Sequence, residues 1–447
     1  MKSTMRSALR KRVHELARAA MACLPRETRF ALYRALVHCD PAPDARLELK
    51  IADTRDELEA CFRILHDSYV AAGFMKPDPS GLRVTTYHAL PTTTTLCAKV
   101  DGRVVGTISL IREGVFGFPM QAAFDLAPVR AKPGKIAEIS ALAVHPDFRK
   151  TGGWILFPLM KFMHEYSTRY FDTRHLVIAV NPNRAEMYES LLFFERLADA
   201  PVVGYAFANG APAVGASLDL AAAGAMFKGV YGRRRDAKNL HRYFFETRLA
   251  NIRAPMRPIY TTNDPVMTPE LIDYFFNQRT AVFQALDQRK RALLHSIYNK
   301  SAYAAVLPPV TAEAARAESL RRHKRFSLRC PGVLRTQDRP VALQVIDVSR
   351  GGLRAEAVGE LRIGCRSTLD IELGPGLHST VEVELMRQAR HADALPEYGF
   401  RLLRVDDVWR QCVGALERGH THSDLAPLDA LEPAPMPERV TPGFALT

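Results

Sequence analysis

The stretch Glu138-Ile-Ser140-Ala-Leu142-Ala-Val144-His-Pro-Asp-Phe-Arg149-Lys-Thr-Gly152-Gly153 decides the fold of the larger part of this chain. Apolar residues surround Glu138 and Ser140, which predicts a β-strand that carries both side chains on one face. A carboxylate on such a strand is costly to bury unless it is paired or functional, and burial raises its pKa toward the range of a general base. Glu138 is therefore a candidate catalytic base, and a structural ion pair with an arginine is the alternative.

The end of the same stretch predicts an anion site. Arg149 and the pair Gly152-Gly153 lead into an expected helix over 154–166. Backbone N–H groups at the start of a helix bind anions such as pyrophosphate.

Strands and helices alternate on both sides of this stretch. Half-buried strands are expected at 47–51, 96–100, 104–111, 175–180 and 216–220, and helices at 58–69 and 184–194. Asp101-Gly102 between two apolar strands predicts a β-hairpin. The order β-α-β-β-β-α-β-α-β over residues 46–220 indicates a layered α+β domain.

Several motifs in residues 46–220 resemble the GNAT acyltransferases. The likeness is strongest to the N-acyl amino acid synthases and extends to the acyl-homoserine-lactone synthases. The motifs are Arg63-Ile-Leu-His-Asp-Ser-Tyr69, Val105-Gly-Thr107-Ile-Ser109, Gly117-Phe-Pro-Met120, Glu138-Ile-Ser140-Ala-Leu142-Ala-Val144 and Asn181-Pro-Asn-Arg-Ala-Glu-Met-Tyr188. Trp154 departs from the GNAT loop, which has a small residue at that place, and this argues against ordinary acetyl-CoA as donor.

The resemblance implies transfer of a long acyl chain from acyl carrier protein, through its phosphopantetheine arm, to an amino acid or similar amine. It implies that Glu138, with Ser140 beside it, serves catalysis. A backbone N–H between Leu142 and Val144 would polarise the thioester carbonyl. Tyr188 would protonate the leaving thiolate, with simple packing as its alternative.

The donor-binding residues implied by the same resemblance follow the strand. Arg149 would hold the phosphopantetheine phosphate, next to Gly152 and Gly153. Leu142, Phe157 and Met160 would line a tunnel for the acyl chain.

A second motif lies near the C-terminus. Arg321-Arg322-His-Lys-Arg325 precedes a run of short predicted strands, and Asp347-Val-Ser349-Arg-Gly-Gly352 follows about twenty residues later. Arginine suits a phosphate because its planar guanidinium donates two hydrogen bonds at once. Asp347 can accept hydrogen bonds from a guanine edge, Ser349 adds a hydroxyl, and Gly352 permits close backbone approach.

These residues resemble the PilZ domain, a receptor for cyclic di-GMP, over residues 320–417. The family's Arg-x-x-x-Arg corresponds to Arg321 and Arg325, and its Asp/Asn-x-Ser-x-x-Gly to Asp347, Ser349 and Gly352. The resemblance implies a small β-barrel that binds cyclic di-GMP as a regulatory ligand, with Arg322 adding a further positive charge.

The rest of the chain divides into three segments. Residues 1–45 predict basic amphipathic helices that either contact a membrane surface or pack on their own domain. Residues 221–319 predict a helical connector, and the Pro-rich residues 418–447 predict a disordered tail.

Composition limits the class of protein. A net charge of +13 favours polyanionic partners such as nucleotides, an anionic membrane or an acidic carrier protein. The seven cysteines are dispersed without metal-ligand spacing, which favours a reducing compartment and no metal. No signal peptide or membrane span is expected, so we expect a cytoplasmic protein, with peripheral contact to the inner membrane left open. No recognition helix or stacking strand points to nucleic acid.

Two functions follow as hypotheses. The first is a cyclic di-GMP-responsive N-acyltransferase of bacterial signalling. The second is a cyclic di-GMP effector whose GNAT-like domain is catalytically inactive and binds a protein partner or lipid.

Overall fold

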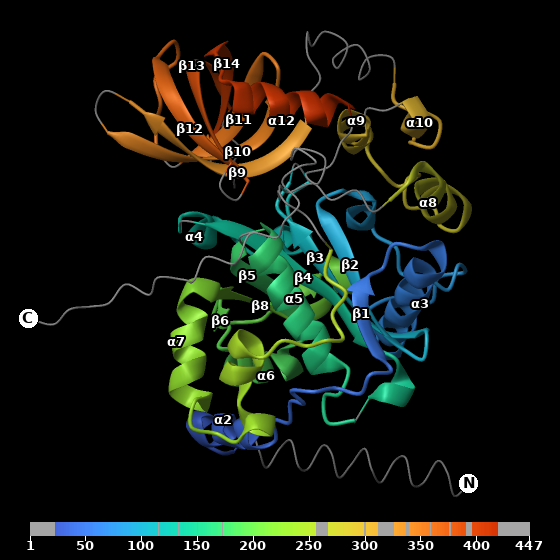
Figure 1. Ribbon diagram of the computed structural model, residues 1–447. Coiled ribbons are helices and arrows are strands. Elements are labelled where there is room, and N and C mark those ends of the chain that lie inside the picture. The colour runs from blue at the N-terminus through green and yellow to red at the C-terminus, as the bar shows by residue number, and fades with distance from the viewer. Residues whose placement is uncertain are drawn as a thin grey trace, which may run out of the picture.

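A mixed β-sheet with helices on both faces and a smaller β-barrel make up the fold (Figure 1). The computed structural model describes residues 23–114, 116–132, 134–149, 151–171, 173–255, 267–298, 301–311, 326–336, 339–357, 359–374, 377–389 and 396–418.

The sheet follows the order β1-β2-β3-β4-β5-β8-β6, and β7 pairs with β8 outside this path. All pairs are antiparallel except β4 with β5. The expected element order over 46–220 is confirmed, with the short elements α4, β6 and β7 added. The strands are β1 (Leu47–Ile51), β2 (Thr93–Val100), β3 (Arg103–Arg112), β4 (Lys135–Val144), β5 (Thr173–Val180), β6 (Glu195–Arg196), β7 (Val202–Tyr205) and β8 (Ala211–Asp219).

The β2–β3 hairpin turns at Asp101-Gly102, as predicted. Both residues have positive φ, 49° for Asp101 and 79° for Gly102. Because glycine adopts this region without steric cost, the sequence Asp-Gly fixes the turn and the register of the hairpin.

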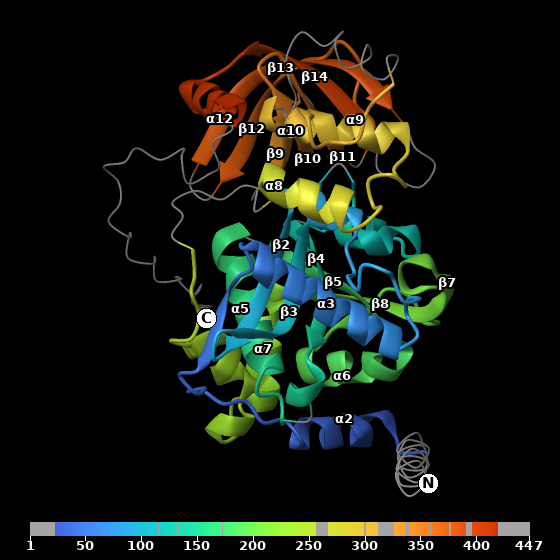
Figure 2. The same ribbon diagram turned by 90° about the vertical axis from the view of Figure 1, so that its right-hand side faces the viewer.

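The two faces of the sheet bury different sets of side chains. Along β2, Leu96 and Ala98 pack in one core with α5, while Cys97 packs in another core with α3. This alternation places α3 and α5 on opposite faces (Figures 1 and 2). The helices before residue 220 are α2 (Arg26–Ala35), α3 (Arg55–Ala71), α4 (Ala127–Arg130), α5 (Leu156–Phe171) and α6 (Pro182–Leu192), with 3₁₀ turns at Thr86–Ala89 (η1), Pro119–Ala122 (η2), Pro146–Phe148 (η3) and Ala206–Ala208 (η4).

Residues after 220, the expected connector, contribute side chains to both of these cores. Phe227 and Phe244 pack with α5, and Phe275 and Phe276 pack with α3. The backbone N–H of Leu49 on β1 also donates to the Asn251 carbonyl at 2.9 Å. The elements are α7 (Leu220–Tyr231), η5 (Asp236–Lys238), the π-turns η6 (Arg242–Glu246) and η7 (Asp273–Gln278), α8 (Pro269–Ile272), α9 (Gln288–Ile297) and α10 (Ser301–Ala304).

The barrel closes in the order β10-β11-β14-β13-β12-β9. Trp409, Cys412 and Val413 of the final helix pack into its core, which confirms the helix predicted there. The elements are β9 (Phe326–Arg335), β10 (Pro340–Ser349), β11 (Gly352–Ala357), β12 (Arg366–Gly374), β13 (Leu377–Ala389), β14 (Glu397–Arg404) and α12 (Asp407–Arg418).

Helix α2 docks on α6 through its arginines. Arg29 forms an ion pair with Glu186 at 2.6 Å, and Arg26 pairs with Glu189 at 3.0 Å. Residues 1–22 of the predicted basic helices lie outside the described residues. Among the helices that are described, none combines the length and the apolar character needed to cross a membrane.

Candidate functional site

Strands β4 and β5 separate partway along their length. Their pairing ends at Glu138 opposite Val177, although β4 continues to Val144 and β5 to Val180. On the other side of β4, the register with β3 shifts by one residue, and Ala141 adopts a positive φ of 55°. This β-bulge lies next to the point where the strands part, and bulges often occur beside active sites.

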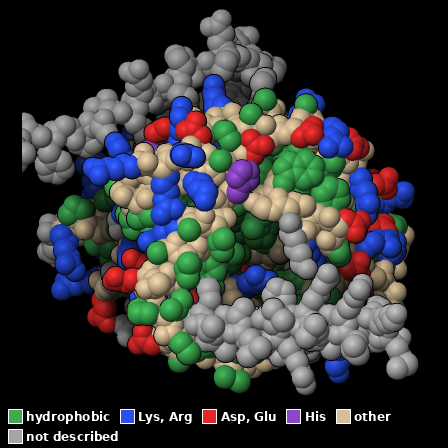
Figure 3. Space-filling view, turned by 90° about the horizontal axis from the view of Figure 1, so that it is seen from below, with side chains coloured by type: hydrophobic (Ala, Val, Ile, Leu, Met, Phe, Trp, Pro, Cys, Tyr) green, Lys and Arg blue, Asp and Glu red, His purple; other side chains and the backbone are tan. Residues whose placement is uncertain are grey.

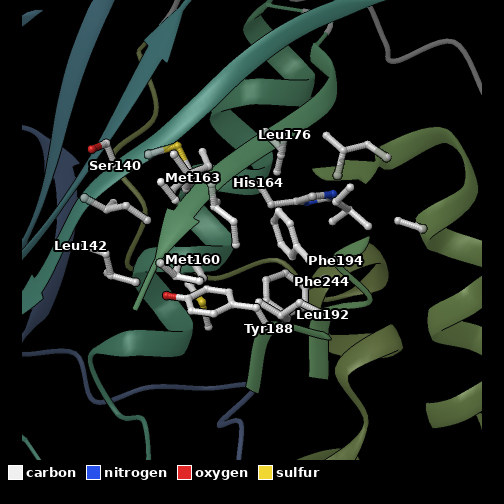
Figure 4. A pocket seen from close by; sticks show the side chains of 18 of the residues that line it. Ser140, Leu142, Met160, Met163, His164, Leu176, Tyr188, Leu192, Phe194 and Phe244 are labelled. Carbon is white, nitrogen blue, oxygen red and sulfur yellow. The ribbon is translucent and has the colours of Figure 1, made fainter. Parts of the chain in front are cut away.

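An apolar cavity of about 180 Å³ lies along this opening. The walls come from β4, β5, α5, α6 and the segments after residue 220 (Figure 4). The lining residues are Tyr69, Ile108, Ile139, Ser140, Ala141, Leu142, Met160, Met163, His164, Leu176, Ile178, Ala179, Val180, Tyr188, Leu192, Phe194, Leu218, Leu220, Ala223, Phe227, Phe244 and Phe245.

The predicted tunnel residues lie partly in this wall. Leu142 and Met160 line the cavity, and Ser140 borders it with its hydroxyl directed away (Figure 4). Phe157 does not line it, and this part of the prediction is wrong. Its ring packs instead against Tyr243, 6.4 Å away between centroids, and covers Gly153.

Glu138 is buried, but it does not line the cavity. Its carboxylate accepts a hydrogen bond from the Met120 N–H at 3.0 Å, and the side chain is 2% exposed. Among the described residues no lysine or arginine forms an ion pair with it. Burial raises the pKa of the Glu138 carboxyl to about 8, although the Met120 hydrogen bond acts in the opposite direction. The carboxyl can therefore gain and lose a proton near neutral pH.

Tyr188 does line the cavity. It stands on α6, and its hydroxyl points toward the β4 side in Figure 4. Burial raises the pKa of the Tyr188 hydroxyl to about 12. The phenol therefore keeps its proton at neutral pH and can donate it.

The predicted donor loop forms a turn ahead of α5. Arg149 donates to the Val144 carbonyl at 2.8 Å and to Ser68 Oγ at 2.7 Å, and it is exposed. Gly152 and Gly153 both have positive φ, 67° and 92°. The turn thus depends on two consecutive glycines, while Val144 does not line the cavity.

A group of aromatic rings that the sequence did not reveal lies beside Glu138 and the cavity. We call Tyr69, Tyr87, Tyr205 and Phe207 the aromatic chamber. The Phe207 ring is 6.5 Å from that of Tyr87 and 6.1 Å from that of Tyr205. Burial, with the nearby Glu138 carboxylate, raises the pKa of both Tyr87 and Tyr205. No single stretch of sequence carries a signal for this group, because its members come from three separate segments.

The described part of the C-terminal motif closes the β10–β11 hairpin. Ser349 Oγ donates to the Gly352 carbonyl at 2.8 Å and accepts from the Gly352 N–H at 3.1 Å. The buried Asp347 carboxylate pairs with Arg354 on β11, a partner that the motif did not predict. Arg321, Arg322 and Arg325 lie outside the described residues.

Gly352 has a packing reason for lacking a side chain. A Cβ at this position would lie 2.5 Å from the Phe400 carbonyl oxygen on β14. The glycine therefore permits close approach of a neighbouring strand. Asp347 and Ser349, the described members of the predicted guanine-binding motif with Gly352, thus make contacts within the barrel.

One face of the molecule is hollowed. Figure 3 shows hydrophobic side chains around this hollow, with Lys and Arg side chains on the surface nearby. The view is from the side where α2 lies in Figure 1.

Within the described residues, no three His, Cys, Asp or Glu side chains are grouped as metal ligands.

Comparison with known proteins identifies two domains. The family "N-acyl amino acid synthase FeeM" matches residues 60–219, and the PilZ domain family matches residues 319–417. No curated protein matched this chain.

Solved structures resemble the same two regions. FeeM, an N-acyl amino acid synthase from uncultured soil microbes, is 25% identical with a TM-score of 0.35, covering 40% of this chain and 94% of its own. BjaI, a CoA-dependent acyl-homoserine lactone synthase, is 21% identical with a TM-score of 0.34, covering 47% and 95%. The PilZ domain of YcgR from Escherichia coli with c-di-GMP is 23% identical with a TM-score of 0.19, covering 22% and 93%. From the two family matches, the chain combines a region of the N-acyl amino acid synthase FeeM type with a region of the PilZ domain type.

Proposed function

We propose that this protein is a cyclic di-GMP-responsive N-acyltransferase that moves a long acyl chain from acyl carrier protein to the amine of an amino acid or similar acceptor. The observation that carries the proposal is the apolar cavity along the opening between β4 and β5, with the β4 bulge and Tyr188 in its wall.

The cavity suits the hydrocarbon part of the donor. Burying about ten methylenes gains roughly 8 kcal/mol before the costs of association. Met160, Met163 and Phe227 in the wall offer the adaptable and aromatic surfaces that such a chain contacts. The net charge of +13 is suited to binding an acidic acyl carrier protein, which would carry the acyl donor.

The chemistry forms an amide bond and breaks a thioester. The neutral amine nitrogen of the acceptor attacks the thioester carbon, and Glu138, directly or through water, accepts the proton that this nitrogen loses as the amide forms. A backbone N–H of β4 between Leu142 and Val144 stabilises the carbonyl oxygen as charge develops on it. Tyr188 donates its proton to the departing phosphopantetheine thiolate. Arg149 and the Gly152-Gly153 turn hold the phosphate of that arm.

The second candidate function is a binding module. Glu138 is buried with the Met120 N–H as its hydrogen-bond donor and does not line the cavity. This favours, as an alternative, an inactive acyltransferase domain that holds a lipid or protein partner under control of cyclic di-GMP.

The deciding experiment compares lipids from a bacterial host by mass spectrometry. The host expresses the wild type, Glu138→Gln, or the matched control Glu48→Gln, with cyclic di-GMP present. Glu48 stands on β1 and pairs with Arg253, away from the cavity. A new N-acylated amine with the wild type and control, and its absence with Glu138→Gln, supports the enzyme. Identical lipids from all three support the binding module.

A further inference from the structure

Arg83 is a partly buried cation held between aromatic rings. Its guanidinium carbon lies 3.9 Å from the centre of the Tyr69 ring and 4.9 Å from that of Phe207. One nitrogen donates to the Phe207 carbonyl at 2.8 Å. The residue sits between α3 and η1, where its own N–H donates to the Phe62 carbonyl at 3.0 Å. Another guanidinium nitrogen donates to Met75 Sδ at 3.9 Å. Stacking and these two side-chain hydrogen bonds thus fix the guanidinium in place.

Arg83 has no carboxylate partner among the described residues, unlike comparable arginines of the same domain. Arg130 pairs with Glu113 at 2.6 Å, and Arg279 pairs with Glu59 at 3.0 Å. Burial lowers the pKa of Arg83, in keeping with a cation that has lost water without gaining a counter-ion. Burying an unpaired charge costs free energy, and an arginine fork binds a carboxylate with two parallel hydrogen bonds. Arg83 is therefore suited to bind an anion.

This anion site adjoins both parts of the proposed reaction centre. Tyr69, which Arg83 covers, also lines the acyl cavity. Phe207, the second ring in contact with Arg83, also contacts Tyr87 and Tyr205. The charge of Glu138 contributes to the raised pKa of both tyrosines. The aromatic chamber therefore connects the Arg83 cation with the acyl cavity, through Tyr69, and with the two tyrosines that the Glu138 charge influences.

We propose that Arg83 binds the carboxylate of an α-amino acid acceptor and so presents its α-amine within the chamber, toward Glu138 and the thioester. The proposal rests on the proposed acyltransferase function and adds the residue that recognises the acceptor's free carboxylate. The aromatic rings surround the bound acceptor and keep water from the thioester. Arg83 acts here by binding and positioning, since it does not touch the bonds that form and break.

The test compares amino acids with their carboxamides as acceptors for the full-length protein. The amide keeps the shape and the amine and removes only the negative charge. With long-chain acyl carrier protein thioesters as donor, we expect the wild type to favour leucine and phenylalanine over leucinamide and phenylalaninamide by about 10- to 100-fold in kcat/KM. Arg83→Gln raises KM for the acids and leaves the values for the amides in place. Arg83→Lys retains part of the preference because it keeps the charge.

Arg55→Gln is the matched control. Arg55 also stacks on a tyrosine, 5.2 Å from the Tyr274 ring centre, but its side chain is 61% exposed and paired with Asp56. An unchanged preference for acids in Arg83→Gln overturns the proposal. An equal loss on acids and amides also overturns it, because that pattern marks a structural role.

Failure of the proposed function gives a different result. If the wild type acylates neither acids nor amides, the acyltransferase proposal fails. The anion site is then tested by a binding measurement alone. Calorimetric titration with N-acetyl-phenylalanine then compares the wild type with Arg83→Gln. Binding that requires Arg83 supports the carboxylate site, and equal binding or none overturns it.

Discussion

Glu138 links the proposed chemistry to pH at the scale of a single residue. If its carboxyl, with a pKa of about 8, is the base, kcat/KM falls tenfold per pH unit below about pH 8 and levels above it. Glu138→Gln loses about 100-fold or more in rate and loses this limb of the pH profile. The acceptor's own amine titration persists in both proteins and serves as the internal control. A profile with the same limb in both proteins would exclude Glu138 as the base.

The raised pKa of Glu138 also makes the stability of the fold depend on pH. Stability falls as the pH rises, whereas the proposed activity increases. The ordinary pKa is 4.5, so between about pH 4.5 and 8 the folded protein holds a proton that the unfolded chain has released. Stability contributed by this group is therefore present at low pH and is lost as the pH rises through about 8. Burial of Glu138 was predictable from its strand, whereas its isolation from arginine was not.

Tyr188 provides the second test at this scale. Its pKa of about 12 keeps the phenol protonated, so it can serve as an acid throughout the neutral range. Tyr188→Phe keeps the ring in the cavity wall and removes the proton. We expect kcat to fall about 100-fold with the donor KM unchanged, measured by release of free thiol. A fall that disappears with a donor of better leaving group confirms the role in thiolate departure, and an unchanged kcat marks Tyr188 as a packing residue.

Residue-level prediction from the sequence selected residues of the cavity wall where one motif contained all the information. Leu142, Met160 and Tyr188 come from local patterns, and all three line the cavity. Arg83 and the aromatic chamber were missed because they come together only when α3, η1 and the β7–β8 connection are folded against each other. The pairing of Asp347 with Arg354 was missed for the same reason, since it depends on the β10–β11 register.

At the scale of elements, the two glycines of the turn before α5 can be compared in a pair of variants. Gly152 and Gly153 both have positive φ, but a Cβ at Gly152 would meet nothing within 4 Å, while one at Gly153 would lie 2.4 Å from the Phe157 ring. Gly152→Ala should cost about 1–2 kcal/mol of unfolding free energy for its backbone conformation alone. Gly153→Ala should cost more by about 1–3 kcal/mol, because the ring of Phe157 must also move.

Denaturant unfolding of the two variants measures the difference. Equal costs would show that Phe157 adjusts freely. If the turn also holds the phosphopantetheine phosphate, both variants raise the donor KM, and Gly152→Ala raises it at the smaller cost in stability.

The sequence predicted individual elements better than their relation to one another. Alternation and Asp101-Gly102 gave the β2–β3 hairpin, since both are local. The separation of β4 from β5 was not predictable, because pairing between strands depends on what packs beneath them. Residues 221–319 were expected to connect two domains. In fact α7 and η6 pack with α5, because Phe227 and Phe244 complete a core that the sheet alone leaves open.

At the scale of the whole molecule, β9 joins the messenger motif to the acyltransferase domain. Arg325 immediately precedes β9, and further along this strand Gly332 and Val333 line a cleft of about 650 Å³. The opposite wall of the cleft includes Lys135 and Thr173, the first residues of β4 and β5. Those are the strands that separate at the cavity, so a shift of β9 on binding cyclic di-GMP would act on the ends of both.

Thermodynamic linkage makes this coupling measurable from both sides. If cyclic di-GMP changes the affinity for acyl donor by a factor, saturating donor changes the affinity for cyclic di-GMP by the same factor, typically about 5- to 150-fold. Titrations of cyclic di-GMP with and without a non-hydrolysable acyl-pantetheine analogue, and of the analogue with and without cyclic di-GMP, give the two factors. Arg321→Ala should remove the response to the messenger. Arg339→Glu, on the cleft wall, should change the coupling factor while cyclic di-GMP still binds, and Arg404→Glu, exposed on β14, should not. Independent affinities in the wild type would mean that the two domains share a chain without regulating each other, because a ligand with equal affinity for both states shifts neither.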